Sequence, residues 1–231
     1  MKSAFRRFLL AGAVALVIFT VVYFAGLRSW HQGWGATPAE LAASMPGDEL
    51  LPNGSGQATH AITIHAAPED IWPWIMQIGQ DRSGFYSYTW LENSIGCEMP
   101  KIERIVPEWP ARTQGETVWF ATPRHFEAQG KMIAAVVEPH RSFAMVMPAD
   151  WSRIQAGGRG QEGLWSFTLV PTGPRTTRLI ARVRNGPPKT VRERLAGLLF
   201  WEPAHFVMER KMLLTIKGLA EGKPTFSSAL R

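Results

Sequence analysis

A continuous apolar run near the start of the chain is the most regular feature of the sequence. Residues 8–27 read FLLAGAVALVIFTVVYFAGL and contain no charged side chain. At about 1.5 Å of rise per residue, about 20 helical residues cross a hydrocarbon core of roughly 30 Å, so the run predicts one transmembrane helix. The alternative is a cleaved secretory signal, whose apolar region usually has only ~7–15 residues before a small-x-small site. This run is longer and ends in Tyr23-Phe24-Ala25, which favours an uncleaved anchor.

The charges beside this run predict its orientation. Lys2, Arg6 and Arg7 precede it, and Arg28 follows it closely. Because the flank that is richer in Lys and Arg stays in the cytoplasm, we expect a single-pass protein of the cell membrane with a cytoplasmic N-terminus. The rest of the chain is then an extracytoplasmic domain, and the membrane bilayer is an expected partner.

Turn-forming residues and periodicity divide the chain into four parts. Residues 1–28 form the predicted anchor, and residues 29–59, rich in Gly, Pro, Ala and Ser, form a predicted linker. Residues 60–221 contain a full set of strand and helix patterns and are predicted to be one domain. Residues 222–231 are a predicted tail. About 200 residues after the anchor are enough for one well-buried core.

Helical periodicity marks three segments of the domain. The first helix opens at Pro68, just after a strand pattern at residues 60–65. A second short helix is expected near residues 85–95. Helical pattern also fills residues 189–221, with an interruption at Glu202-Pro203. The first helix has one apolar face at helical spacing, made by Ile71, Trp74, Ile75 and Ile78.

Alternating apolar and polar residues predict about seven strands. Turn residues at 139–141 and 171–174 fit the tight connections of an antiparallel sheet, and 148–163 is a longer loop. The predicted strands are 60–65, 101–106, 116–122, 131–138, 142–147, 164–170 and 176–184. We therefore predict an α+β fold in which a curved antiparallel sheet of about seven strands grips a long C-terminal helix. Such an arrangement leaves a cavity between sheet and helix.

Composition and charge exclude some classes of function. The chain has 231 residues, of which 45% are apolar, and a formal net charge of +6. Four of its 25 Lys and Arg residues lie at or before Arg28, where no acidic residue lies. The remaining 21 basic and 19 acidic residues leave a charge of about +2. Because a nucleic-acid partner requires a clustered basic face, we expect none.

Motifs of familiar catalytic and metal sites are absent from the sequence. It contains no GxSxG, no HExxH and no GxxxxGK[ST]. A single cysteine, Cys97, excludes an internal disulfide and a multi-cysteine metal site. His60 and His65 fall on opposite faces of a strand and do not easily share a metal ion. We therefore predict no metal site and no cofactor, and we assign no catalytic residue.

A long motif and several short ones carry a family resemblance. The long motif spans residues 70–93 and reads DIWPWIMQIGQDRSGFYSYTWLEN. The short motifs follow in order: IVPEW at 105–109, VEP at 137–139, TRL at 177–179 and MERKML at 208–213. Together they resemble bacterial membrane-associated proteins of the polyketide cyclase/dehydrase (SRPBCC) group, within the START-like superfamily. The resemblance implies the helix-grip fold and a cavity that holds a hydrophobic molecule, but no particular reaction.

One stripe on the final helix combines a histidine with apolar residues. His205, Met208, Met212, Ile216 and Leu219 advance by three or four residues and share a face. Methionines adapt to irregular ligands, and an imidazole beside them suits the polar end of a ligand or a general base. The alternative is a boundary or core histidine beside ordinary core methionines.

Aromatic residues are dense, with ten Trp and twelve Phe, and supply the other candidates for ligand contacts. Aromatic side chains suit apolar pockets that make a few polar contacts. Ordinary core packing is the alternative for each residue. The predicted ligand-binding residues are Tyr86, Trp90, Trp119, Met145, Trp165, Phe167, His205, Met208 and Met212.

Two sets of charged residues have a structural and a functional interpretation. Asp81, Arg82 and Glu92 surround the turn between the two short helices, where they either bind a ligand carboxylate or hold the turn together. We favour the structural role. The last strand has arginines on one face, which we expect to be solvated; they are Arg178, Arg182 and Arg184.

Residues 191–201 read VRERLAGLLFW and end just before Pro203. Because proline fits the first turn of a new helix, we predict that this segment is a separate, angled helix. Leu195, Leu198, Leu199 and Phe200 give it apolar surface. The segment either forms a flap at the cavity mouth that contacts lipid and gates entry, or packs fully onto its own domain.

Three functions remain open from the sequence. The first, which we predict, is a membrane-anchored module that binds a hydrophobic small molecule, such as a lipid or polyketide-like compound, for holding or transfer. The second is a cyclase or dehydratase-type enzyme that moves protons on such a ligand. The third is a scaffold with a filled core. A paired acid and base facing the cavity would favour the second, and a packed interior would favour the third.

Overall fold

The computed structural model describes residues 6, 7, 10, 12, 14, 17, 18 and 20–222. Part of the predicted anchor at 8–27 lies outside these residues. Lys2 and nearly all of the predicted tail also lie outside them. Within the described part of the chain, no helix has both the length and the apolar character needed to cross a bilayer. From residue 20 the chain is helical through the π-helix η1 (Tyr23–Leu27) and α2 (Arg28–Gln32).

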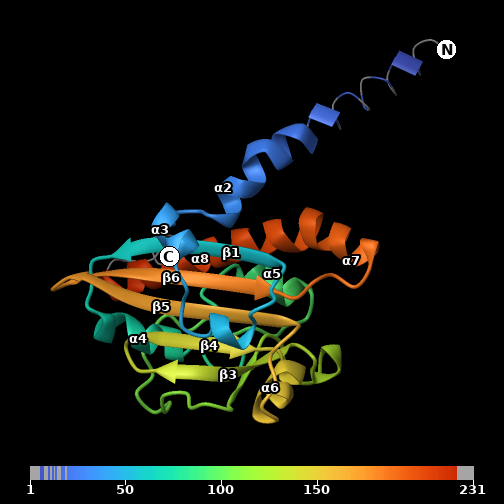
Figure 1. Ribbon diagram of the computed structural model, residues 1–231. Coiled ribbons are helices and arrows are strands. Elements are labelled where there is room, and N and C mark those ends of the chain that lie inside the picture. Colours follow the sequence, from blue (N-terminus) through green and yellow to red (C-terminus); the bar gives the residue numbers. More distant parts are fainter. Residues whose placement is uncertain are drawn as a thin grey trace.

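The core of the fold is an antiparallel sheet of six strands in the order β1-β6-β5-β4-β3-β2 (Figure 1). Strands β2 to β6 follow one another as a meander, and β1 closes the sheet against β6. Their bounds are β1 Gly56–Ile64, β2 Thr117–Trp119, β3 Lys131–Glu138, β4 Ser142–Val146, β5 Gly163–Gly173 and β6 Thr176–Asn185. The predicted tight turns join β3 to β4 and β5 to β6.

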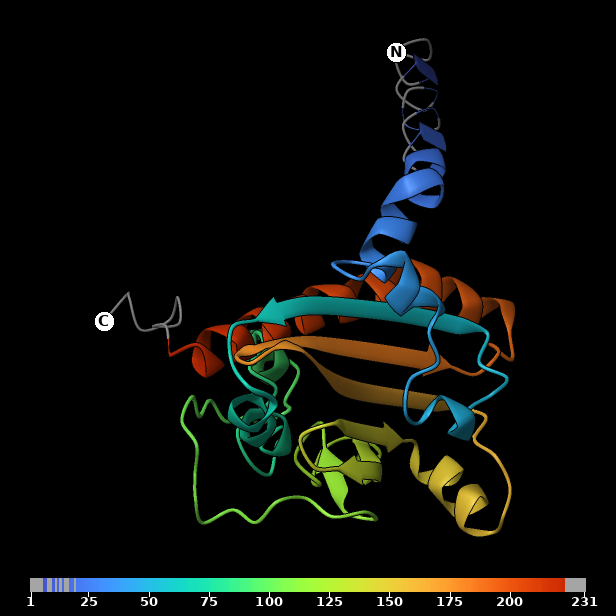
Figure 2. The same ribbon diagram turned by 60° about the vertical axis from the view of Figure 1, so that its left-hand side comes forward.

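One long helix, α8 (Glu202–Ala220), runs along the sheet beside β1 (Figure 2). Met212 and Ile216 of α8 share a hydrophobic cluster with Phe143, Phe167 and Leu179 of the sheet. The shorter helices are α3 Pro38–Ala42, η2 Asp48–Leu50, α4 Pro68–Met76, α5 Thr89–Ser94, η3 Phe126–Ala128, α6 Pro148–Gln155, α7 Val191–Ala196 and η4 Gly197–Trp201. A strand, two short helices, an antiparallel meander and a long C-terminal helix make the helix-grip fold that the START-like resemblance predicted.

The sheet has six strands instead of seven because residues 101–106 form a loop. Gln77 provides the hydrogen bonds that a neighbouring strand would otherwise provide. Its amide Nε2 donates to the Arg104 carbonyl at 3.2 Å, and its Oε1 accepts from the backbone N–H of Val106 at 2.7 Å. Since buried backbone groups need partners of some kind, the Gln77 side chain takes the place of strand pairing at these two positions.

The predicted loop 148–163 contains α6, which the sequence analysis missed. Pro148 starts the helix, and the buried carboxylate of Asp150 accepts hydrogen bonds from three backbone N–H groups further along the loop. These donors are Gln161 at 2.8 Å, Glu162 at 2.9 Å and Gly163 at 3.0 Å. Asp150 therefore folds the loop back onto the start of β5.

The arginine face of β6 is buried, contrary to the prediction that it is solvated. Residues 33–55 cross this face of the sheet, and Arg182 is only 1% exposed beneath them. Its guanidinium donates to Asp48 Oδ2 at 2.6 Å, to the carbonyls of Glu40 and Ala43 at 2.8 Å each, and to Thr59 Oγ1 at 3.0 Å. The segment predicted as a linker is thus bound to the sheet by a buried cation.

Residues 191–201 do not form a separate helix. The backbone of Ala196, Trp201 and Glu202 stays right-handed helical, so α7, η4 and α8 follow one continuous course. In the π-helical register of η4, the N–H of Glu202 bonds to the Gly197 carbonyl, and the next residue, Pro203, has no N–H to donate. The Tyr23 hydroxyl donates to the Leu198 carbonyl at 2.6 Å instead. A residue of the N-terminal helix therefore satisfies the carbonyl that the proline leaves free.

Candidate functional site

A cavity of about 530 Å³ lies between the sheet and α8. Its walls come from the segment before α5, from α5, from strands β3, β5 and β6, and from α8. Most of the lining is apolar, with a few titratable groups. The lining residues are Phe85, Ser87, Glu92, Phe120, Met132, Met147, Glu162, Gly163, Leu164, Trp165, Val183, Asn185, His205, Met208, Glu209 and Met212.

Three aromatic rings form one wall of the cavity. Phe85 stacks on Trp165 with ring centroids 5.7 Å apart. Phe120 meets both rings edge-on, at 5.0 Å from Phe85 and 5.8 Å from Trp165. Offset and edge-on contacts of this kind are the arrangements that aromatic quadrupoles favour. The wall is therefore a rigid apolar surface.

The polar end of the cavity is built around Glu209 of α8, which is 3% exposed. The indole N–H of Trp165 donates to its Oε1 at 2.5 Å. Nδ1 of His60, on β1, contacts its Oε2. Nε2 of His205 lies 3.3 Å from Oε1. One buried carboxylate thus holds side chains from two strands and its own helix.

The protonation of the His60–Glu209 pair follows from its partners. Nε2 of His60 is 2.7 Å from the backbone carbonyl of His31, which can only accept, so this nitrogen carries a hydrogen. Burial lowers the pKa of His60, but the hydrogen bond and the charge of Glu209 outweigh it, and the net pKa is raised. Burial likewise raises the pKa of Glu209, but His205 and His60 outweigh it, and the net pKa is lowered. An imidazolium and a carboxylate therefore face each other in the core.

His205 sits between this pair and the cavity. Its ring stacks on His60 at 6.2 Å and meets Trp165 edge-on at 5.6 Å. Nε2 is buried and has no hydrogen-bond partner among the described residues. His205 is thus oriented by stacking and by the charge of Glu209, while its side chain remains 30% exposed.

Glu92 is the second titratable group with an unusual setting. It reaches the cavity from α5, and its Oε2 is buried with no hydrogen-bond partner in the described part of the chain. Burial raises the pKa of Glu92 to about 7. Near neutral pH the cavity therefore contains a carboxyl group that is protonated in a large fraction of molecules. Across the described residues, no cluster of His, Cys, Asp or Glu could hold a metal ion.

The predicted ligand-binding residues divide into two groups. Trp165, His205, Met208 and Met212 line the cavity. The other five do not. Met145 and Phe167 are fully buried in the core, Tyr86 packs edge-on against Trp74, Trp119 lies under the ammonium of Lys131, and Trp90 is 71% exposed.

Asp81 and Arg82, at the turn between the two short helices, have the structural role that the sequence favoured, whereas Glu92 does not. Arg82 donates to the carbonyls of Met76 and Pro110 at 2.8 and 2.9 Å. Asp81 pairs with Arg112, at 3.0 Å from Nη2. These contacts hold the turn, whereas Glu92 lies in the cavity wall.

The sequence analysis did not identify Glu209 or the partnership of His60. Two signals pointed to them. His205 and Glu209 are four residues apart and so share a helix face, and His60 shares its strand face with Ala58 and Ile62. A polar residue in such a pattern is expected to have a buried partner. The identity of that partner, 149 residues away, required the fold.

Comparisons with known proteins find similar solved structures but no family. No family model matches the sequence, and no curated protein matches it. Solved structures with related folds include a polyketide cyclase-like protein from Corynebacterium glutamicum, at 17% identity over 71% of this chain and 85% of that one, with a TM-score of 0.33.

Two further structures are similar at the same level. Norcoclaurine synthase from Thalictrum flavum is 14% identical over 77% of this chain and 93% of its own, with a TM-score of 0.36. A protein from Nitrosospira multiformis is 12% identical over 75% and 99%, with a TM-score of 0.41. These likenesses concern the fold and assign neither ligand nor activity.

Proposed function

We propose that this protein binds a hydrophobic small molecule, of lipid or polyketide-like character, in the cavity between the sheet and α8, for holding or transfer. The observation that carries the proposal is a mostly apolar cavity of about 530 Å³ with a few titratable groups in its lining. Ligand pockets typically have about 300–1,000 Å³, apolar walls and a few placed polar groups. The open interior argues against a scaffold whose core is filled.

The chemistry of the walls defines the class of ligand. The body of the molecule is apolar, since Phe85, Phe120 and the methionines cannot compensate buried polar groups. The molecule carries a polar group at one end, because the lining also includes Glu92, His205 and Glu209. A free carboxylate is disfavoured at this end, because Glu209 already places a negative charge beside it.

The first experiment purifies the full chain from its own host and analyses it by native mass spectrometry and lipid extraction. We expect a co-purified apolar compound at close to one per chain. Met208→Trp fills the cavity, and we expect it to lower ligand occupancy by ~tenfold or more. Val207→Trp is the matched control, because Val207 neighbours Met208 but is exposed and lies outside the lining. Equal loss in both variants, or an empty wild-type protein, would contradict the proposal.

A second function, a cyclase or dehydratase-type enzyme acting by proton transfer, is favoured by one specific observation. Glu92 and the His205–Glu209 pair are both in the wall of the same cavity. A group that donates a proton and a group that accepts one then face a common ligand.

We also propose that the protein works at a membrane surface, to which the apolar N-terminal run tethers it. Two features of the described residues support this proposal. Leu199, Phe200 and Trp201 are 59%, 60% and 65% exposed, which is unusual for neighbouring large apolar side chains. The N-terminal helix docks beside them through Tyr23 and through Arg28, whose guanidinium bonds to the Glu202 carboxylate at 2.8 and 3.0 Å.

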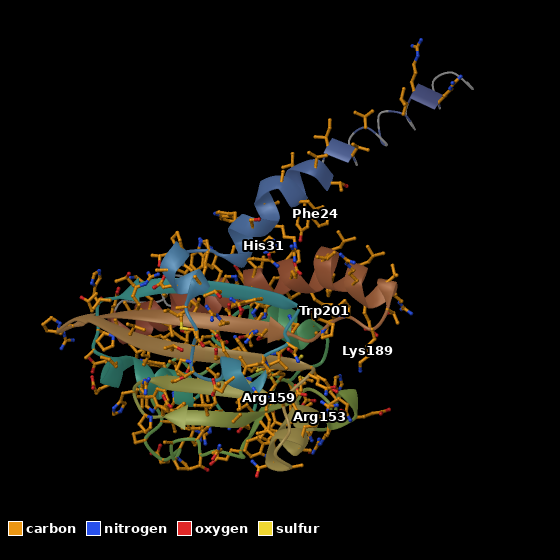
Figure 3. The ribbon with its side chains drawn as sticks, in the orientation of Figure 1. Phe24, His31, Arg153, Arg159, Lys189 and Trp201 are labelled. Atoms are coloured by element: carbon orange, nitrogen blue, oxygen red, sulfur yellow. The ribbon has the colours of Figure 1, made fainter. Side chains whose placement is uncertain are left out.

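These contacts join two apolar surfaces. The exposed side chains of the N-terminal helix continue toward α7 and η4, and Figure 3 shows Phe24 and Trp201 away from Arg153 and Arg159 at the other end of the domain. Lys189, Arg192 and Arg194 at the start of α7 suit anionic headgroups. The occupant of this surface is therefore a phospholipid bilayer. No residue of the predicted flap at 191–201 is among the residues that line the cavity.

Site-specific labelling tests this membrane contact in the full chain. With Cys97 replaced by serine, a polarity-sensitive fluorophore at Phe200→Cys is expected to shift to the blue in lipid nanodiscs and to be quenched by nitroxide-labelled lipid. Arg159→Cys is the control and is expected to report water. Unquenched, water-like emission from position 200 would mean that the segment does not touch lipid.

A further inference from the structure

We propose that the N-terminal helix is part of the ligand site, because it positions the polar end and the aromatic wall of the cavity through His60. Docking of this helix on α8 and binding in the cavity then strengthen each other. The inference rests on the proposed ligand-binding function and adds a control of binding by the segment that leads to the predicted anchor. It follows from one chain of contacts that starts at the backbone of His31 and ends at Trp165.

His60 connects the N-terminal helix directly to the cavity wall. Its side chain is buried, and each ring nitrogen has a partner. Nε2 lies 2.7 Å from the backbone carbonyl of His31 in α2, and Nδ1 contacts Oε2 of Glu209, which lines the cavity. Burial lowers the pKa of His60, but the hydrogen bonds to Glu209 and to the His31 carbonyl, with the charge of Glu209, outweigh it. Withdrawal of the carbonyl would therefore leave a buried N–H without its acceptor and weaken the ion pair.

Glu209 links this contact to the shape of the cavity. Its Oε1 accepts the indole N–H of Trp165 at 2.5 Å. Trp165 in turn stacks on Phe85 at 5.7 Å and meets Phe120 edge-on at 5.8 Å, so its orientation affects the whole aromatic wall. A displaced Glu209 carboxylate would therefore change both the charge at the polar end and the surface against which a ligand packs.

Polar contacts to Glu202 dock the N-terminal helix on the same helix that carries Glu209. Arg28 donates to both carboxylate oxygens of Glu202, at 2.8 and 3.0 Å. Gln32, one turn further along, donates to the same carboxylate at 3.1 Å. Glu202 and Glu209 are seven residues apart and so lie on one face of α8, two turns from each other. The docking contact and the cavity carboxylate are thus joined by a short rigid element.

Phe206 fills the space between the docked helix and His60. Its ring centroid lies 5.3 Å from that of Trp30, 5.6 Å from that of His31 and 5.5 Å from that of His60. Phe206 is only 9% exposed, so this cluster keeps water away from the contact between His31 and His60. Movement of the N-terminal helix would open the cluster and hydrate His60. The contact chain therefore has a docked form and an undocked form.

The helix that carries His31 continues toward the predicted anchor. Residues 20–32 are helical without a break, and Figure 3 shows His31 where this helix meets the domain. A change in the tilt of the N-terminal run therefore moves the His31 carbonyl and the Arg28 guanidinium together. Because docking and binding share the contact between His60 and Glu209, each strengthens the other by the same factor.

Charge reversal across the docking contact tests this coupling with the full chain in lipid nanodiscs. The probe is N-phenyl-1-naphthylamine, a neutral apolar fluorophore, and Met208→Trp supplies the background from probe in the lipid. We expect Arg28→Glu and Glu202→Arg each to raise the Kd of the probe by ~tenfold. The double variant forms the ion pair in reverse and should restore most of the affinity. Arg175→Glu, which reverses an exposed charge between β5 and β6, should leave the Kd unchanged.

Spin labels measure the docking itself. With Cys97 replaced by serine, labels at the exposed positions Ser29→Cys and Arg159→Cys report the distance between the N-terminal helix and the domain. We expect Arg28→Glu to broaden the distance distribution and a saturating amount of probe to narrow it again. A helix that stays docked in Arg28→Glu, or one that moves while the Kd of the probe stays unchanged, would overturn the inference.

The two proposals fail in different ways. If the wild type and Met208→Trp take up the probe equally, the cavity is not a ligand site, and the proposed function itself is overturned. If the wild type binds more probe than Met208→Trp, while Arg28→Glu and Glu202→Arg bind as tightly as the wild type, only the control by the N-terminal helix is overturned.

Discussion

Replacing Asp48 with alanine is expected to lower the free energy of unfolding by about 3–5 kcal/mol, the range found when one partner of a buried ion pair is removed. Asp48 Oδ2 lies 2.6 Å from Nη1 of Arg182, and both side chains are almost entirely buried. The same oxygen also accepts the backbone N–H of Met45 at 2.9 Å. Alanine would leave the Arg182 guanidinium in the core without a compensating charge.

Urea denaturation of the full chain in detergent micelles, followed by tryptophan fluorescence, measures this effect. The double variant Asp48→Ala with Arg182→Met is the informative control, because it removes both charges and keeps an apolar stem of similar length. We expect the double variant to be more stable than Asp48→Ala alone. The single variant Arg182→Met is measured as well. If the losses of unfolding free energy in Asp48→Ala and Arg182→Met add up to the loss in the double variant, the stability does not come from the charge pair.

The sheet and the main helices could be predicted because their signals are local. The strand at 131–138 coincides with β3, and the stripe at Ile71 and Ile75 is the buried face of α4. Each depends on a repeat of two or about 3.6 residues that a short window contains. The same local reasoning placed the tight turns between β3 and β4 and between β5 and β6 to within a few residues.

The remaining features depend on contacts between distant residues. Arg182 lies in an alternating strand pattern, so the sequence predicts that its side chain faces solvent. The residues that cover it, Glu40 and Ala43, lie about 140 residues earlier in the chain. Residues 101–106 alternate like a strand, but the Arg104 carbonyl and the Val106 N–H bond to the side chain of Gln77 instead of to a neighbouring strand. Neither outcome has a local signature.

The candidate site shows the same division. The stripe that contains His205, Met208 and Met212 was visible from helical spacing, and these residues do line the cavity. Trp90 and Trp119 were chosen for residue type alone, which does not specify the direction of a side chain. Glu209 was missed because a single acidic residue on a helix is usually solvated.

Replacing Glu209 with leucine is expected to cost about 3 kcal/mol, because it leaves three groups without their acceptor in a dry site. These groups are the Trp165 indole N–H, Nδ1 of His60 and the facing edge of His205. Glu209→Gln has the same shape, but it keeps one acceptor oxygen and replaces the other by an NH2 donor, so it removes the charge together with one hydrogen bond. The difference between the two variants therefore measures the hydrogen bond that glutamine keeps.

The stabilisation from the His60–Glu209 pair is expected to fall at both low and high pH, for a different reason in each direction. The pKa of Glu209 is lowered on folding, so its contribution is present above its ordinary value of 4.5 and is lost as pH falls through the folded pKa. The pKa of His60 is raised on folding, so its contribution is present below its ordinary value of 6.5 and is lost as pH rises through the folded pKa. The two overlap fully between pH 4.5 and 6.5.

The stability gap between wild type and Glu209→Gln should therefore be largest in that window and shrink toward either side. Denaturation curves collected at a series of pH values measure it directly. A gap that does not vary with pH would mean that the pair is neutral, with the proton on Glu209.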